Sequence, residues 1–86
     1  MPEICRFFGI VIAMYYDDHP PPHFHAVYGS EQAEFTIDPP GLLRGRLSPR
    51  ALSLVMEWAV LHQQELLEAW EQRTAGRRIR KIKPLR

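Results

Sequence analysis

Cysteine is almost missing from this chain of 86 residues, in which Cys5 is the only one. One thiol cannot form an internal disulfide, and structural zinc sites usually use more than one cysteine. The simplest interpretation of Cys5 is therefore a small buried apolar group. A chain without disulfides is typical of a reducing compartment, so we expect a cytoplasmic protein.

Long hydrophobic runs are missing as well. The apolar segment from Phe7 to Tyr16 is too short to cross a bilayer, and it lacks the basic start and small-residue cleavage site of an export signal. The chain also has no phosphate-binding glycine loop, serine elbow or C-x-x-C pair. These absences predict no membrane segment and remove the most common catalytic motifs.

Acidic residues are missing from the C-terminal end, although the whole chain has a net charge of only +1. The body, residues 1–76, contains five basic and ten acidic residues, a charge of −5, whereas the tail, residues 77–86, has a charge of +6. Such a tail can bind nucleic acid or an acidic protein, or neutralise its own body. Apolar residues recur at every third position in it, so it is either docked or a mobile arm. Its basic residues are Arg77, Arg78, Arg80, Lys81, Lys83 and Arg86.

The first half of the chain predicts β-strands. Residues 6–16 are rich in aromatic and β-branched residues without alternation, which is typical of a strand buried on both faces. The three prolines at positions 20–22 end this strand, because proline has no N–H to give to a sheet. Residues 24–28 and 31–38 then predict a hairpin around Gly29-Ser30, followed by a turn and a short strand over residues 42–47.

The hairpin turn determines which side chains share a face. If Tyr28 lies opposite Glu31, alternation along the strands produces one apolar and one polar face. The apolar face consists of Phe24, Ala26, Ala33, Phe35 and Ile37, and the polar face of His23, His25, Glu34 and Thr36. A second hairpin would add Arg44 and Arg46 to the polar face, and Leu43 and Leu47 to the apolar one.

One long helix follows, with Ser48 as its N-cap and Pro49 in its first turn. No glycine or proline interrupts it before Gly76, and its apolar stripe includes His62, which we predict to be a core residue. We therefore predict one α+β domain over residues 1–86, in which about four antiparallel strands form a meander packed by one long C-terminal helix. Because the helix covers the apolar face, the polar face is open or covered by a partner.

The polar face contains the candidate metal ligands. His23 and His25 alternate on one strand and point the same way, about 7 Å apart, and imidazole is a good ligand for zinc. Glu34, His19 or Asp17 could complete the coordination. In the alternative interpretation the histidines bond the proline loop and Glu34, so we expect no cofactor first and a zinc-like ion second.

The two arginines extend this face toward anion chemistry. Arginine binds phosphate with a planar fork, and histidine transfers protons near neutral pH. His23, His25 and Glu34 with Arg44 or Arg46 therefore have the equipment of a ribonuclease, with or without a metal. The same groups also suit RNA binding, with tyrosines that stack on bases. A solvated face with scattered charges is the simplest alternative.

Several short segments of the sequence are distinctive, above all Pro21-Pro22-His23-Phe24-His25-Ala26. Others are Pro2–Ile4, Arg6–Ile10, Met14–His19, Arg50–Leu52, Glu57–Ala59, Leu61-His62, Leu66-Leu67 with Trp70, and Lys81–Leu85. Together they resemble the bacterial domain-of-unknown-function family 4160 (DUF4160). The resemblance implies no established activity. It implies a small bacterial protein often encoded beside a second small protein, of the DUF2442 type, as a candidate toxin–antitoxin module.

These observations give three hypotheses of different classes. The first is a binding module, one member of a two-protein pair, that binds the neighbouring protein and also RNA or DNA. The second is a nuclease toxin that uses the face of His23 and His25. The third is a structural metal site on that face.

Overall fold

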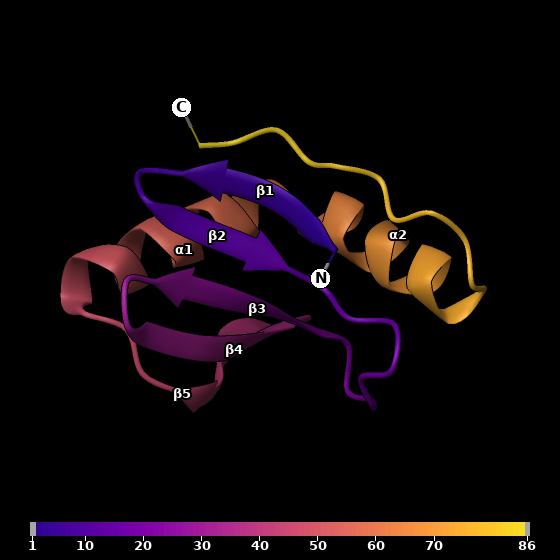
Figure 1. The fold of residues 1–86 in the computed structure, drawn as a ribbon, viewed down its shortest axis with the longest axis horizontal. Coiled ribbons are helices and arrows are strands. Elements are labelled where there is room, and N and C mark those ends of the chain that lie inside the picture. Colours follow the sequence, from indigo (N-terminus) through magenta and orange to yellow (C-terminus); the bar gives the residue numbers. More distant parts are fainter. Residues whose placement is uncertain (1, 86) are drawn as a thin grey trace.

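The structure is a computed structural model that describes residues 2–85. Five strands form one antiparallel sheet in chain order (Figure 1): β1 Glu3–Phe7, β2 Ile10–Ala13, β3 His23–Tyr28, β4 Glu31–Ile37 and β5 Pro40–Gly45. Two helices follow: α1 Pro49–Leu61 lies behind the sheet in this view, and α2 Gln63–Thr74 lies to the right, beyond the end of the sheet. The α+β meander is confirmed, but the expected four strands and one helix are in fact five strands and two helices.

The first correction concerns the predicted strand over residues 6–16, which is a hairpin of β1 and β2. Phe8 and Gly9 have φ angles of 50° and 79° and form its two-residue turn, so that Phe7 lies opposite Ile10. Two successive left-handed residues are the backbone of the turn that best suits a hairpin. A bulky residue such as Phe8 rarely adopts this conformation, so Gly9 is the one signal that the sequence carries for the turn.

The register predicted for the next hairpin is confirmed. In the pairing of β3 with β4, Tyr28 lies opposite Glu31, Phe24 opposite Phe35 and His25 opposite Glu34. The apolar face is buried as expected, because Phe24 and Phe35 are fully buried and their rings stack with centroids 5.4 Å apart. The edge of the Trp58 ring packs on Phe24 from α1, which joins the helix layer to the sheet.

The last strand begins and ends two residues earlier than the predicted strand over residues 42–47. It contains an irregularity, because Glu34 pairs with Arg44 whereas its neighbour Phe35 pairs with Leu42. Gly45 follows with a φ angle of 85°, and a Cβ atom there would lie 2.5 Å from the carbonyl oxygen of Gln32. The two strands thus approach closely beside Arg44, and only glycine fits this position.

The second correction is a break in the helix at His62, whose φ and ψ angles are −117° and 25°. The hydrogen bonds of the main chain continue across it, since the N–H of His62 donates to Trp58 and its carbonyl accepts from Leu66. No glycine or proline marks the break. The second helix then ends where Gly76 predicted, with that glycine at a φ angle of 71°.

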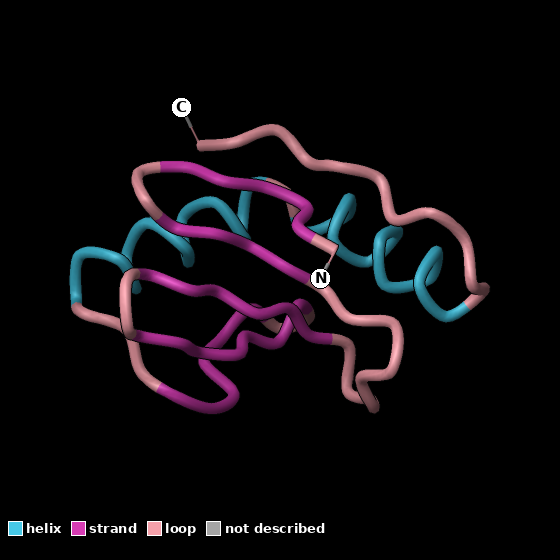
Figure 2. The backbone as a smooth tube through the Cα atoms, in the orientation of Figure 1, coloured by secondary structure: helices cyan, strands magenta, loops and turns pink. Residues whose placement is uncertain are grey.

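The tail lies against the body over its described part, residues 77–85, and Arg86 is outside the described residues. Ile79 and Ile82 are buried, the N–H of Ile82 donates to the carbonyl of Ile4, and the indole N–H of Trp58 donates to that of Lys83. Figures 1 and 2 show this segment running beside β1. The tail is therefore docked. Within residues 2–85, neither helix is long and apolar enough to cross a membrane.

Ser48 occupies the N-cap position as predicted, but its hydroxyl does not cap the helix. The hydroxyl donates to the carboxylate of Glu31 over 2.7 Å, and the N–H of Ser48 donates to the same oxygen over 2.8 Å. These hydrogen bonds hold the pKa of Glu31 below its ordinary value. The pair joins the start of α1 to the start of β4.

We predict that Glu31→Gln lowers the free energy of unfolding at pH 7. A carboxyl whose pKa is lowered by folding contributes stability above its unfolded pKa of about 4.3, and loses it as the pH falls through the folded value. The deficit of the variant should therefore shrink between pH 7 and pH 3 in urea unfolding curves. Glu57→Gln, an exposed change on α1, is the control. Equal midpoints for both variants at pH 7 would show that the Glu31–Ser48 contact contributes nothing.

Candidate functional site

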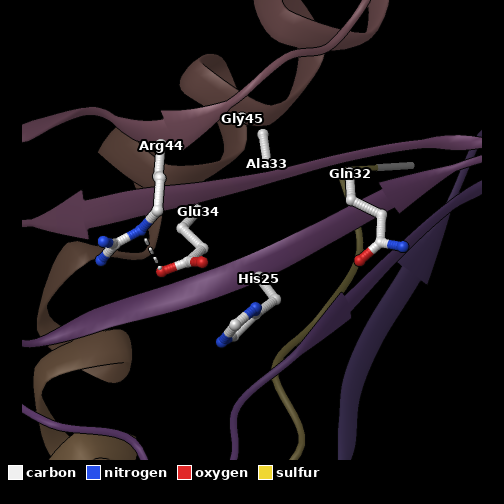
Figure 3. Close-up of a pocket in the computed structure, with 6 residues that line it drawn as sticks. All are labelled: His25, Gln32, Ala33, Glu34, Arg44 and Gly45. Atoms are coloured by element: carbon white, nitrogen blue, oxygen red, sulfur yellow. Dashed lines mark hydrogen bonds and ion pairs between the residues drawn. The ribbon is translucent and has the colours of Figure 1, made fainter.

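The polar face of the sheet, called the outer face below, carries two rows of paired residues. One row runs Arg6, Val11, Val27, Gln32, and the other runs Ala13, His25, Glu34, Arg44. The guanidinium Nε of Arg44 donates to Glu34 over 3.2 Å (Figure 3). A shallow depression of about 230 Å³ lies here, lined by His25, Gln32, Ala33, Glu34, Arg44 and Gly45.

Asp18, from the loop between β2 and β3, completes a cluster with the two histidines. Its Oδ2 atom lies 2.8 Å from Nε2 of His25 and 3.4 Å from Nε2 of His23. One ligand atom from each of the three residues lies within 4.8 Å of the others. We call this group the Asp18–His23–His25 cluster.

His23 is the most enclosed member, although it lies on the polar face as predicted. The residue is only 4% exposed, and Trp70 of α2 packs against its ring at the end of the sheet, with ring centroids 5.4 Å apart. Its Nδ1 lies 2.8 Å from the carbonyl oxygen of Pro21, and its Nε2 lies 3.5 Å from Glu34. The proline loop therefore orients the ring, and the polar edge of the ring faces the carboxylates.

Arg73 holds the loop that carries Asp18. The guanidinium is buried at the end of α2, stacks 3.7 Å above the Trp70 ring, and donates to the carbonyls of Tyr16 and Asp18 over 2.7 and 3.0 Å. A third, longer bond of 3.4 Å reaches the carbonyl of Tyr15. One buried side chain thus organises three main-chain groups of the loop.

Sequence reasoning identified the two histidines and Glu34 but missed Asp18 and Arg73. Asp17 was one of three residues expected to be able to complete the coordination, yet it is exposed, and its neighbour Asp18 turns toward the histidines. The only available signal was the run of prolines before β3, which turns the chain so that the start of the loop lies beside the histidines of that strand. Arg73 was indistinguishable from any other polar residue near the end of a helix.

Three other candidates lie apart from the cluster. His19 is exposed. The backbone N–H of Arg46 donates to the carbonyl of Gln32, and the guanidinium of Arg46 lies near the carboxylate of Glu31. His62 is half-buried on the helix layer, where its Nδ1 lies 2.6 Å from Glu65. The outer face and the helix histidine are therefore separate, and His62 does not join the site.

The described basic residues of the tail are exposed but do not form an isolated positive surface. Arg80 and Lys81 line a small groove together with Glu65 and Glu68 of α2. The N–H of Arg80 also donates to the side chain of Gln72 on the same helix. The tail thus lies beside acidic residues of its own body. This is the alternative in which the tail neutralises the charge of the body.

A family model described as "Domain of unknown function (DUF4160)" matches residues 9–71, which span β2 to α2 and contain the whole Asp18–His23–His25 cluster. Comparisons with curated proteins and with solved structures found no match. The matched region covers well over half of the chain. It confirms the resemblance to this family that the proline–histidine segment and the other distinctive segments predicted. The chain belongs to the DUF4160 family.

Proposed function

We propose that this chain is a binding module that docks a second small protein on its outer face, as one member of a two-protein pair. The open outer face carries the proposal. α1 lies behind the sheet, α2 lies beyond its end, where Trp70 covers His23, and the tail runs along β1 (Figure 1), so a partner can reach the centre of the face directly. Its centre is formed by Val11 and Val27, which lie opposite each other on β2 and β3 and are half-buried.

The charges on this face favour a protein partner over a nucleic acid. Arg6 pairs with Glu3 on one side of the valines over 2.8 Å, and Arg44 pairs with Glu34 on the other over 3.2 Å. Paired charges of both signs give little attraction for a polyanion, which needs unpaired basic groups. An apolar centre with a polar rim is typical of a protein interface. The proposed partner is the DUF2442-type neighbour that the family resemblance implies.

We predict that Val27→Arg weakens the complex with the neighbouring gene product at least about tenfold, or roughly 1.4 kcal/mol. A guanidinium at the centre of the interface would lose its water without gaining a partner. Dissociation constants from isothermal titration calorimetry measure the effect. Val60→Arg is the matched control, because Val60 is 61% exposed on α1, away from the outer face.

The proposal fails if wild-type protein forms no complex at micromolar concentration. It also fails if Val60→Arg weakens the complex as much as Val27→Arg, because the partner would then occupy the helix layer.

One contact favours a second candidate function, that of a ribonuclease-like toxin. Asp18 Oδ2 lies 2.8 Å from Nε2 of His25, and a carboxylate that orients a histidine is a recurrent arrangement in proton-transfer sites. Glu34 lies between His25 and Arg44 on the sheet and accepts a hydrogen bond from Arg44. Arg44 would have to break this hydrogen bond to bind a phosphate. The arrangement is compatible with proton transfer but has no free arginine.

If the second function is correct, His25→Ala lowers the rate of RNA cleavage by about 100-fold or more, as expected for loss of a general base. Cleavage of a fluorescent RNA by purified protein measures it, together with circular dichroism to verify the fold. His62→Ala, on the helix layer, should cleave like the wild type. Equal activity in the wild type and His25→Ala would eliminate the nuclease.

A further inference from the structure

We propose that Asp18, His23 and His25 bind one divalent transition-metal ion, with zinc as the best-fitting ion. This site is independent of the partner-binding proposal. It rests on the positions of three ligand atoms and on the hydrogen bonds that fix the orientation of one ring.

The hydrogen bond of His23 determines which of its nitrogens is free. A carbonyl oxygen only accepts, so the contact of 2.8 Å with Pro21 places the proton of a neutral ring on Nδ1. Its Nε2 then carries a lone pair directed at the carboxylates. Histidines that bind metals usually donate their other N–H to a carbonyl or carboxylate in this way.

The lone pair of His23 faces only acceptors. Oδ2 of Asp18 lies 3.4 Å from its Nε2, and Oε1 of Glu34 lies 3.5 Å from the same atom. A lone pair directed at two carboxylate oxygens is unfavourable unless a cation lies between them. Arg44 already donates to Glu34, and Nε2 of His25 donates to Asp18, so an ion bound at Nε2 of His25 would replace that proton. A metal ion at this point would accept the lone pair of His23 and offset the negative charge of the carboxylate of Asp18.

The distances suit a small ion with nitrogen ligands. A tetrahedral zinc ion at about 2.0–2.1 Å from its ligands holds those atoms roughly 3.3 Å apart. The contacts of 3.4 and 2.8 Å that Asp18 makes with the two histidines lie on either side of this value. Two imidazoles and one carboxylate are a ligand set for zinc and similar transition metals, and magnesium or calcium would require more oxygen ligands.

The loop is held in place before any ion arrives. Arg73 fixes the main chain at Tyr16 and Asp18, and Pro21 fixes the ring of His23. Three protein ligands leave a fourth position for water or for Glu34, the nearest further carboxylate. The ion would therefore lie beside the depression of the outer face rather than within the core.

Titration of zinc chloride into protein without a histidine tag, at pH 7.5, tests the site by calorimetry. We expect one zinc ion per chain and a higher melting temperature. Asp18→Asn and His25→Ala should weaken binding by at least about 100-fold, more than loss of a second-shell partner costs. Both side chains are about one-fifth exposed, so these variants are safer for folding than a change at buried His23. His19→Ala and His62→Ala are the controls and should bind like the wild type.

Nitrogen-15 NMR of the imidazoles in the wild-type protein gives a readout without variants. Zinc should shift the Nε2 signals of His23 and His25 and leave that of His62 unchanged. No saturable binding up to about 1 mM zinc would overturn the proposal. So would equal affinity in the wild type and Asp18→Asn, or a loss of binding in His19→Ala or His62→Ala that matches the loss in His25→Ala.

Discussion

The hydrogen bonds from Arg73 to the carbonyls of Tyr16 and Asp18 are the contact on which the candidate site depends. They join the end of α2 to a loop that has three prolines and little regular structure of its own. The guanidinium also lies over Trp70, which packs against His23, so one buried charge supports both sides of the cluster. Without it, the loop would keep the contacts of Asp18 with the histidines and the hydrogen bonds at its ends, from the hydroxyl of Tyr16 to Arg77 and from the N–H of Ile37 to Pro22.

α1 and the tail pack on the inner face and on the edge of β1, and α2 reaches only the end of the outer face, where Trp70 packs on His23. Trp58 lies at the centre of this arrangement, because it packs on Phe24 of the sheet and its indole N–H donates to Lys83 of the tail. The tail also covers part of the edge of β1, where Ile82 donates to Ile4. An edge strand protected in this way is less prone to pair with another chain. The outer face, with its two valines between ion pairs, is the surface that we propose for partner binding.

Local sequence rules predicted the central hairpin and its two faces. They failed where contacts between residues far apart in the sequence determine the structure. Side chains alternate with a period of two, so the turn at Gly29-Ser30 was sufficient to place His25 opposite Glu34. The turn at Phe8-Gly9 has a glycine but a bulky residue before it, the helix break at His62 has neither glycine nor proline, and both were missed. Asp18 and Arg73 meet through tertiary packing, 55 residues apart, which no pattern in the sequence reveals. The histidines were therefore predictable, and the residues that organise them were not.

The central claim is that loop and strand assemble two imidazoles and one carboxylate into a ligand set, and zinc X-ray absorption spectroscopy of the loaded protein tests it most directly. The account predicts a first shell of nitrogen and oxygen at about 2.0–2.1 Å with the scattering of two imidazole rings. Cys5 lies in the core on β1, opposite Ile12, so no sulfur should contribute. A sulfur shell at about 2.3 Å, or a shell of oxygen atoms without imidazole, would contradict the account.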